Sequence, residues 1–178
     1  MKKIIYYVAQ SVDGFIAGKN DDVTAFIHQG KSIEKYQNDL SQFKTVIMGR
    51  RTYEFGYQFG LMPGQPAYPG MEHHIFSNSL KFQNSHSAVH IEHLNVDRVL
   101  ELKQHSPSDI YLCGGGQFAG WLLDHHLIDQ IKLKLNPVIL GIGTPLFGNS
   151  QTIYSLKYEN CEGFKDGLQI LTYSVQYQ

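Results

Sequence analysis

Residues 109–124 read DIYLCGGGQFAGWLLD, and this stretch predicts a strand, a sharp turn and a helix in immediate succession. Its short apolar run stops at three consecutive glycines, and apolar residues then recur at helical spacing. A helix that opens at such a turn points unpaired backbone N–H groups and the positive end of its dipole at one spot, which suits a phosphate. The alternative is a glycine turn that only permits tight packing, and the triplet alone leaves both open.

The glycine spacing argues against a dinucleotide-binding fold of the Rossmann type. That fingerprint requires G-x-G-x-x-G and an acidic residue about twenty positions later. Here Gly120 follows Gly116 one residue too late, and no acidic residue ends a strand at the required distance. The turn is therefore a candidate phosphate loop outside that class.

A second apolar run, residues 45–48 (TVIM), also ends at a glycine that opens a predicted helix. Gly49 is followed by Arg50, Arg51 and Thr52, which we predict to form the first helical turn. Cations at a helix N-terminus oppose its dipole, an arrangement that makes sense when an anion binds between them. Surface arginines without a ligand are the alternative.

A third predicted strand, residues 73–76 (HHIF), ends at Ser77 and Asn78, whose polar groups can hold a phosphate or simply form a turn. The carboxyl ends of parallel strands lie along one edge of a sheet, and ligands bind at that edge. Three phosphate-compatible junctions on one edge match an extended nucleotide better than a single phosphate. We therefore predict a nucleotide cofactor.

The remaining segments indicate an α/β fold. Ser32 and Asn95 are expected to cap helices that run to about residues 43 and 104. Residues 15–18 form a short apolar loop, either a lid over a site or a plain connection. Five further strands are expected near residues 4–9, 89–91, 128–135, 153–158 and 168–177, the last two as an antiparallel pair.

At 178 residues, with 42% apolar and 17% charged residues, the chain is expected to form one domain spanning residues 1–178. The net charge of −1 and the lack of a long basic run give nucleic acid or an anionic membrane no electrostatic reason to bind. Cys113 and Cys161 lie far apart in the sequence and fit a reducing compartment. The first apolar run is too short for a signal sequence, so we expect a cytoplasmic protein.

The two histidine pairs, His73–His74 and His125–His126, do not indicate a metal site. Adjacent residues point apart on a strand or a helix, so neither pair can readily chelate through both rings. We expect all four rings to be exposed, and we predict no bound metal.

Three stretches resemble the dihydrofolate-reductase-like superfamily: residues 7–17 (YVAQSVDGFIA), 46–54 (VIMGRRTYE) and 111–116 (YLCGGG). Within it, the chain is most similar to the C-terminal reductase domain of the bifunctional riboflavin-biosynthesis deaminase/reductase. The resemblance implies a mostly parallel central β-sheet flanked by helices, with an antiparallel C-terminal strand pair. It also favours a homodimer, as do the long apolar strands near the C-terminus.

The same resemblance implies NADPH as the cofactor, bound along the three junctions. The nicotinamide would lie at the first strand and the following loop, and the adenosine 2′-phosphate would lie at the third junction. It further implies a cis peptide bond between the first two glycines of the triplet. The cofactor-binding residues it implies are Ala9, Ile16, Gly49, Arg50, Arg51, Thr52, Ser77, Asn78, Cys113, Gly114, Gly115, Gly116, Gln117 and Phe118.

We therefore predict an NADPH-dependent reductase of a small heterocyclic substrate that is pterin-like, pyrimidine-like or flavin-precursor-like. No catalytic residue is assigned, because Glu34 and Asp39, on the helix where true dihydrofolate reductases carry a carboxylate, are both expected to be solvated. The zinc motif of the fused deaminase is absent from the sequence. An NADP(H)-binding protein without turnover is the alternative.

Overall fold

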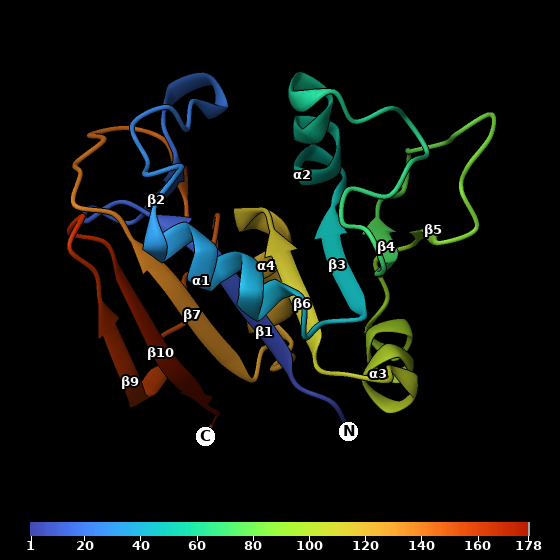
Figure 1. The fold of residues 1–178 in the computed structure, drawn as a ribbon. Helices are drawn as coiled ribbons and strands as arrows, with labels where there is room; N and C mark the ends of the chain where they lie inside the picture. The colour runs from blue at the N-terminus through green and yellow to red at the C-terminus, as the bar shows by residue number, and fades with distance from the viewer. Residues whose placement is uncertain (178) are drawn as a thin grey trace.

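Eight strands form one central sheet in the order β5-β4-β3-β6-β1-β7-β10-β9 (Figure 1). The structure is a computed structural model that describes residues 1–177. The strands of this sheet are β1 (Ile4–Gln10), β3 (Thr45–Gly49), β4 (Glu72–Phe76), β5 (Val89–Glu92), β6 (Ile110–Gly114), β7 (Gln130–Leu135), β9 (Ser155–Gly163) and β10 (Gln169–Gln176).

The pairing within this sheet is mostly parallel, as the family resemblance implies. All contacts from β5 across to β7 are parallel, whereas β7–β10 and β10–β9 are antiparallel. A separate two-stranded sheet joins β2 (Phe15–Ala17) to β8 (Thr144–Pro145). Residues 15–17 belong to the segment for which the sequence allows either a lid or a connecting loop, and they form a paired strand.

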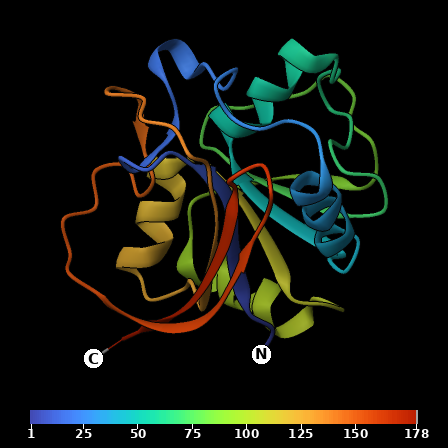
Figure 2. The ribbon, with the colours of Figure 1, turned by 60° about the vertical axis from the view of Figure 1, so that its left-hand side comes forward.

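Helices cover both faces of the central sheet, and Figure 2 shows α4 and α1 on opposite sides of it. One apolar cluster packs the inner residues of α3 and α4 against alternate residues of β1 and β6, and a second packs α1 against the residues between them. This two-sided burial explains why the strands read as continuous apolar runs. The helices are α1 (Lys31–Leu40), α2 (Arg50–Phe55), α3 (Val96–His105) and α4 (Gly116–Asp124), with 3-10 turns η1 (Lys19–Asp21) and η2 (Gly56–Phe59).

The two predicted helix caps have different outcomes. Asn95 caps α3, because its side chain accepts a hydrogen bond from the Asp97 amide. Ser32 does not cap α1: Gly30 is the N-cap, and Ser32 lies inside the helix. Its buried hydroxyl instead donates to Asp166 Oδ2 at 2.7 Å, a tertiary contact to the turn between β9 and β10.

The expectation that His73 and His74 are exposed is wrong. His73 and His74 are buried because β4 is an interior strand with both faces covered. The ring of His73 hydrogen-bonds to the Met71 carbonyl and accepts from the Tyr68 amide, and burial lowers the pKa of both rings. The second pair, at the end of α4, is exposed as expected.

Two features are absent from residues 1–177. In this part of the chain, no three His, Cys, Asp or Glu side chains gather in a way that could hold a metal ion. Over the same residues, no helix has the length and apolar character needed to cross a membrane.

Candidate active site

The three strand–turn junctions lie together at one edge of the central sheet. Strands β4, β3 and β6 are consecutive neighbours and parallel, so Phe76, Gly49 and Gly114 end the strands on the same edge. Helices α2 and α4 start directly after β3 and β6. The predicted convergence of the junctions is therefore correct.

The two helix-opening junctions are in direct contact. A Cβ atom built on Gly115 would lie 2.9 Å from Thr52 Oγ1, and one built on Gly49 would lie 3.2 Å from Phe118 Cβ. Glycine at these positions lets the start of α4 pack against the start of α2. Gly114 has a φ of +124°, a conformation that favours glycine, and the Gly114–Gly115 peptide bond is cis as the resemblance implies. We call this site, formed by residues 49–52 and 115–118, the junction corner.

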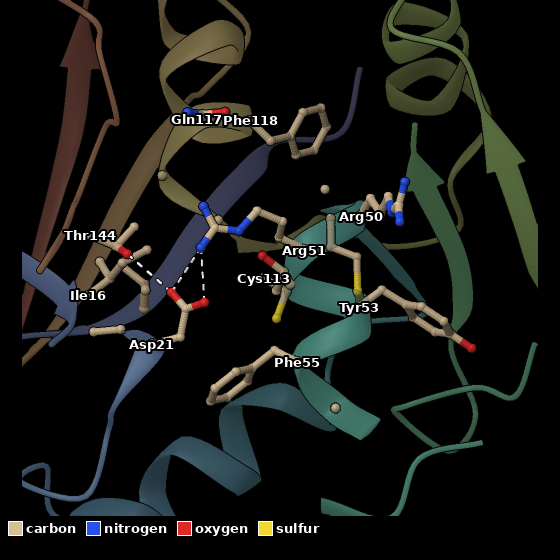
Figure 3. A pocket seen from close by; sticks show the side chains of 18 of the residues that line it. Ile16, Asp21, Arg50, Arg51, Tyr53, Phe55, Cys113, Gln117, Phe118 and Thr144 are labelled. Atoms are coloured by element: carbon tan, nitrogen blue, oxygen red, sulfur yellow. Dashed lines mark hydrogen bonds and ion pairs between the residues drawn. The ribbon is translucent and has the colours of Figure 1, made fainter. Parts of the chain in front are cut away.

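A cavity of about 700 Å³ opens at the junction corner and is within the usual size range of ligand pockets (Figure 3). Of the implied cofactor-binding residues, eleven line it: Ala9, Ile16, Gly49, Arg50, Arg51, Thr52, Cys113, Gly115, Gly116, Gln117 and Phe118. Gly114, Ser77 and Asn78 are not among the lining residues. Most of the residue set drawn from the sequence thus surrounds a single cavity.

The two helix N-termini at the corner carry no side-chain cap. Gly49 is the N-cap of α2 and Gly115 is the N-cap of α4, and neither helix start receives a capping hydrogen bond from a side chain within residues 1–177. The first N–H groups of a helix need a partner, and the dipole favours an anionic one. The donor chemistry of this corner therefore fits phosphate groups.

Each arginine of the corner already has a carboxylate partner. Arg51 donates to both oxygens of Asp21, at 2.9 and 3.2 Å, and Figure 3 shows this pair beside Thr144. Arg50 donates to Glu54 and also to Ser79 Oγ, at 2.8 Å each. Both arginine side chains remain well exposed to solvent, at 71% for Arg51 and 45% for Arg50. Each arginine is therefore already paired, so it is neither an unpaired surface charge nor an unoccupied anion-binding group.

The third junction forms a turn beside Arg50. Ser77 is buried, and its hydroxyl accepts hydrogen bonds from the amides of Ser79 and Leu80, which close the turn. Asn78 Oδ1 lies 3.3 Å from His93 Nδ1. Through Ser79 the turn contacts Arg50, so it borders the junction corner without lining the cavity.

A second part of the cavity lining is a group of hydroxyl and thiol side chains that no sequence motif links to one another. We call Tyr36, Tyr68, Tyr111 and Cys113 the tyrosine wall. The Tyr36 and Tyr111 hydroxyls are 2.7 Å apart, and Tyr68 Oη lies 3.2 Å from Cys113 Sγ. Burial raises the pKa of all four groups, so they are neutral at physiological pH.

Lys134 of β7 also lines the cavity, with its Nζ 3.6 Å from the centre of the Tyr36 ring. Lys134 belongs to the polar half of an alternating strand pattern, which usually faces solvent, but it is only 9% exposed. The alternation is real, yet the polar face of β7 here meets the cavity and the tyrosine wall. No local pattern in the sequence distinguishes it from an ordinary solvated lysine.

The two helix carboxylates behave differently from one another. Glu34 is exposed as predicted, whereas Asp39 accepts hydrogen bonds from Tyr7, Lys35 and Lys132. Burial acts to raise the pKa of Asp39, but the two lysines outweigh it and hold that pKa below its ordinary value. Asp39 is not a solvated charge, and it does not line the cavity.

Comparison with known proteins places this geometry among related chains. YyaP of Bacillus subtilis (strain 168), an uncharacterized protein, is 27% identical, with 97% of this chain and 94% of YyaP covered. The structure of a Shewanella sp. PV-4 protein, provisionally named a riboflavin biosynthesis protein, matches with a TM-score of 0.82 at 23% identity. The match covers 99% of this chain and 100% of the Shewanella chain.

Dihydrofolate reductase from Enterococcus faecalis, solved with NADP(H) and an inhibitor named RAB-propyl, has a TM-score of 0.64 at 14% identity, over 97% of this chain and 94% of that one. The fold is therefore dihydrofolate-reductase-like. The RibD C-terminal domain family matches residues 2–170, and the chain belongs to that family.

Proposed function

We propose that this protein is an NADPH-dependent reductase of a small heterocyclic substrate. The observation that carries the proposal is the junction corner, where two uncapped helix N-termini and two arginines border one end of a cavity that continues to the tyrosine wall. Such a cavity offers a charged end for phosphates and an aromatic side for flat rings. Family membership supports reductase chemistry, and the named dihydrofolate reductase binds NADP(H) in the same fold.

The glycines support the fit of the cofactor because they let the two helix starts approach each other closely. A side chain at Gly49 or Gly115 would press against Phe118 or Thr52 and push the two N-termini apart. In this proposal the diphosphate is held by the first N–H groups of α2 and α4, with Thr52 beside them. Arg51 exchanges part of its contact with Asp21 for the phosphates, because its ion pair with Asp21 is exposed to solvent and therefore weak.

Arg50 is the residue we assign to the 2′-phosphate that distinguishes NADPH from NADH. It lies between the cavity and the turn at Ser77–Ser79, where it already donates to the Ser79 hydroxyl. This is the side on which the family resemblance puts the adenosine. Ser77 and Asn78 would then act through the turn that positions Ser79, and not through the cavity surface.

The substrate class follows from the remainder of the lining. Tyr36, Tyr68, Phe55 and Phe59 offer flat or apolar surfaces, which favour a planar ring over a sugar or a chain. When bound, the nicotinamide supplies the hydride, and the residues of this chain orient the ring and exclude water. Pterin-, pyrimidine- and flavin-precursor-type rings all meet this description.

A fluorescence titration with NADPH and NADH, followed by oxidation assays with a panel of such heterocycles, tests the proposal. We expect NADPH to bind more tightly than NADH and at least one ring of the panel to be reduced. Failure to bind either nucleotide would contradict the proposal. Binding of NADPH without oxidation across the panel would favour the alternative, an NADP(H)-binding protein without turnover.

A further inference from the structure

Lys134 is a buried cation, and within residues 1–177 its ammonium has no carboxylate within ion-pair distance. Its surroundings include the face of the Tyr36 ring and the Cys113 thiol. The other buried lysine, Lys103, is bonded to Asp129 at 2.7 Å. Lys132, two positions along the same face of β7, is bonded to Asp39 at 3.1 Å.

A buried ammonium without such a partner is costly, and the tyrosine ring compensates it only in part. The cavity gives this cost a functional explanation, because Lys134 is one of its lining residues. A ligand atom with a lone pair or a negative charge would supply the hydrogen-bond acceptor that the protein does not provide for this ammonium. A phosphate is already provided for at the junction corner, so Lys134 faces a different part of the ligand.

The register of the sheet locates that part. Lys134 is paired with Ala9 across β1 and β7, and Ala9 is the residue assigned to the nicotinamide side of the cofactor site. Its other neighbour, Ile170 on β10, is apolar. Lys134 therefore lies next to the position where a substrate ring would meet the nicotinamide.

We propose that Lys134 binds the electronegative atom of the substrate's reducible C=N or C=O group and gives it the proton that accompanies the hydride. This inference rests on the proposed function and names the proton donor that the sequence left unassigned. As the substrate carbon accepts the hydride, the π electron pair moves to nitrogen or oxygen. That atom takes a proton from Lys134 Nζ, the N–H electron pair stays on the lysine, and water then restores the ammonium.

The surroundings make Lys134 a better acid than its neighbours. Burial lowers the pKa of Lys134 to about 8, whereas burial raises the pKa of the tyrosine and cysteine groups of the wall. An acid whose pKa lies near the working pH transfers its proton most effectively. The charged and titratable groups around it are Tyr7, Tyr36, Asp39, Tyr68, Tyr111, Cys113, Lys132 and Glu162, with Asp21 and Arg51 at the junction corner.

The first test measures binding and does not depend on turnover. Wild type, Lys134→Met, Lys134→Arg and Lys132→Met are titrated by calorimetry with uracil-6-carboxylate and with uracil, in the presence of NADP⁺. At pH 7 we expect wild type to prefer the carboxylate about tenfold, the scale of one charge-assisted hydrogen bond. The preference should vanish in Lys134→Met and persist in Lys134→Arg and in the control Lys132→Met, whose side chain does not line the cavity.

The pH dependence has a defined sign. The ammonium form of Lys134 is present below its pKa of about 8, so the carboxylate preference of wild type should fall as the pH rises from 7 to 9.5. Lys134→Arg should keep its preference over this range, because arginine stays charged. A wild type without preference for the carboxylate, or a Lys134→Met variant that keeps it, would overturn the assignment.

The second test separates proton donation from charge. With NADPH and a ring that wild type reduces, we expect kcat to fall about 100-fold in Lys134→Met and also in Lys134→Arg, while NADPH affinity stays within twofold. The wild-type rate should fall above pH 8, and the rate of Lys134→Met should not. A Lys134→Met rate within threefold of wild type, with the same pH profile, would overturn proton donation. A wild type that binds no NADPH would remove the reductase proposal, and the calorimetric test would still decide the role of Lys134.

Discussion

The junction corner and the tyrosine wall border the same cavity but are built in different ways. The corner consists of backbone N–H groups and glycines from two short segments, each continuous in the sequence. The wall collects side chains from α1, β6 and the loop before β4, with Lys134 from β7 beside it. Backbone geometry of the first kind suits a ligand group shared by a whole family, such as a diphosphate. The side chains of the wall can be substituted one at a time without altering the backbone, so we expect them to determine substrate specificity.

Disrupting the corner should have the largest effect. A Cβ on Gly116 would lie 2.2 Å from the Pro145 carbonyl oxygen and 3.1 Å from the Gly148 nitrogen, so Gly116→Ala forces α4 away from the loop around β8. We expect the free energy of unfolding to fall by about 3 kcal/mol and NADPH affinity to drop at least tenfold. Urea denaturation and fluorescence titration measure the two effects.

The matched control for this substitution is Gly163→Ala at the end of β9, where an added Cβ meets nothing within 4 Å. It should change the free energy of unfolding by less than about 0.5 kcal/mol. If Gly116→Ala proved equally mild, the close packing of α4 against the loop would be wrong.

Removing charge from the corner should have the next largest effect. The double variant Arg50→Ala, Arg51→Ala should bind NADPH roughly 100-fold more weakly, because each charge-assisted hydrogen bond contributes about 1.5–3 kcal/mol. NADH should lose less, since it lacks the 2′-phosphate that we assign to Arg50. Nucleotide titrations of both single variants and the double variant measure this.

Arg98→Ala is the control, because Arg98 pairs with Glu92 and Glu101 and does not line the cavity. It should leave both nucleotide affinities unchanged. Equal losses for NADPH and NADH in Arg50→Ala would show that this residue does not read the 2′-phosphate.

Replacing Lys134, beside the tyrosine wall, should increase the free energy of unfolding. Lys134→Met replaces a buried ammonium that has no carboxylate partner among residues 1–177 with an apolar chain of similar length, and we expect about 2 kcal/mol of stabilisation at pH 7. The folded-state pKa of about 8 lies below the ordinary value of 10.5, so between these values the unfolded wild type binds more protons. Wild-type stability should therefore rise across this window, and the advantage of the variant should shrink.

Urea denaturation at pH 7 and at pH 10 tests this prediction. A Lys134→Met variant less stable than wild type at pH 7 would mean that the ammonium is satisfied within the protein. In that case Lys134 would not need a ligand contact to satisfy its charge.

The smallest expected effect concerns Asp21, which holds Arg51 at the cavity. Asp21→Asn removes a negative charge that competes with the phosphates for the guanidinium, so we expect NADPH to bind about threefold more tightly at low salt. Asp22→Asn is the control, since Asp22 accepts from the Thr24 amide and does not line the cavity. Weaker binding in Asp21→Asn would show that Asp21 positions Arg51 for the ligand.

The junction corner could be predicted from the sequence because its parts are local. A strand that ends at Gly49 or Gly114 and a helix that starts directly after it are visible in one short window, and parallel pairing then brings the two together. The Asn95 cap follows from an equally local pattern, whereas the mostly parallel sheet is implied by the family resemblance.

The tyrosine wall could not be predicted because its parts meet only through the fold. Tyr36 and Tyr111 are 75 positions apart and share a hydrogen bond, and Lys134 gives the same alternating pattern as a lysine in water. The burial of the β4 histidines cannot be predicted for a related reason. Only the folded sheet shows that β4 is an interior strand between β5 and β3 and that these side chains are buried. The hydroxyl of Ser32 was assigned to a local cap, although its partner is Asp166, 134 positions away.

A crystal structure of the chain grown with NADPH tests the central claim most directly. We predict a diphosphate in contact with the first amides of α2 and α4, the 2′-phosphate at Arg50, and the nicotinamide ring beside Ala9 with its reactive carbon facing the space next to Lys134. A nucleotide bound elsewhere on the molecule, or one whose nicotinamide points away from Lys134, would contradict the account.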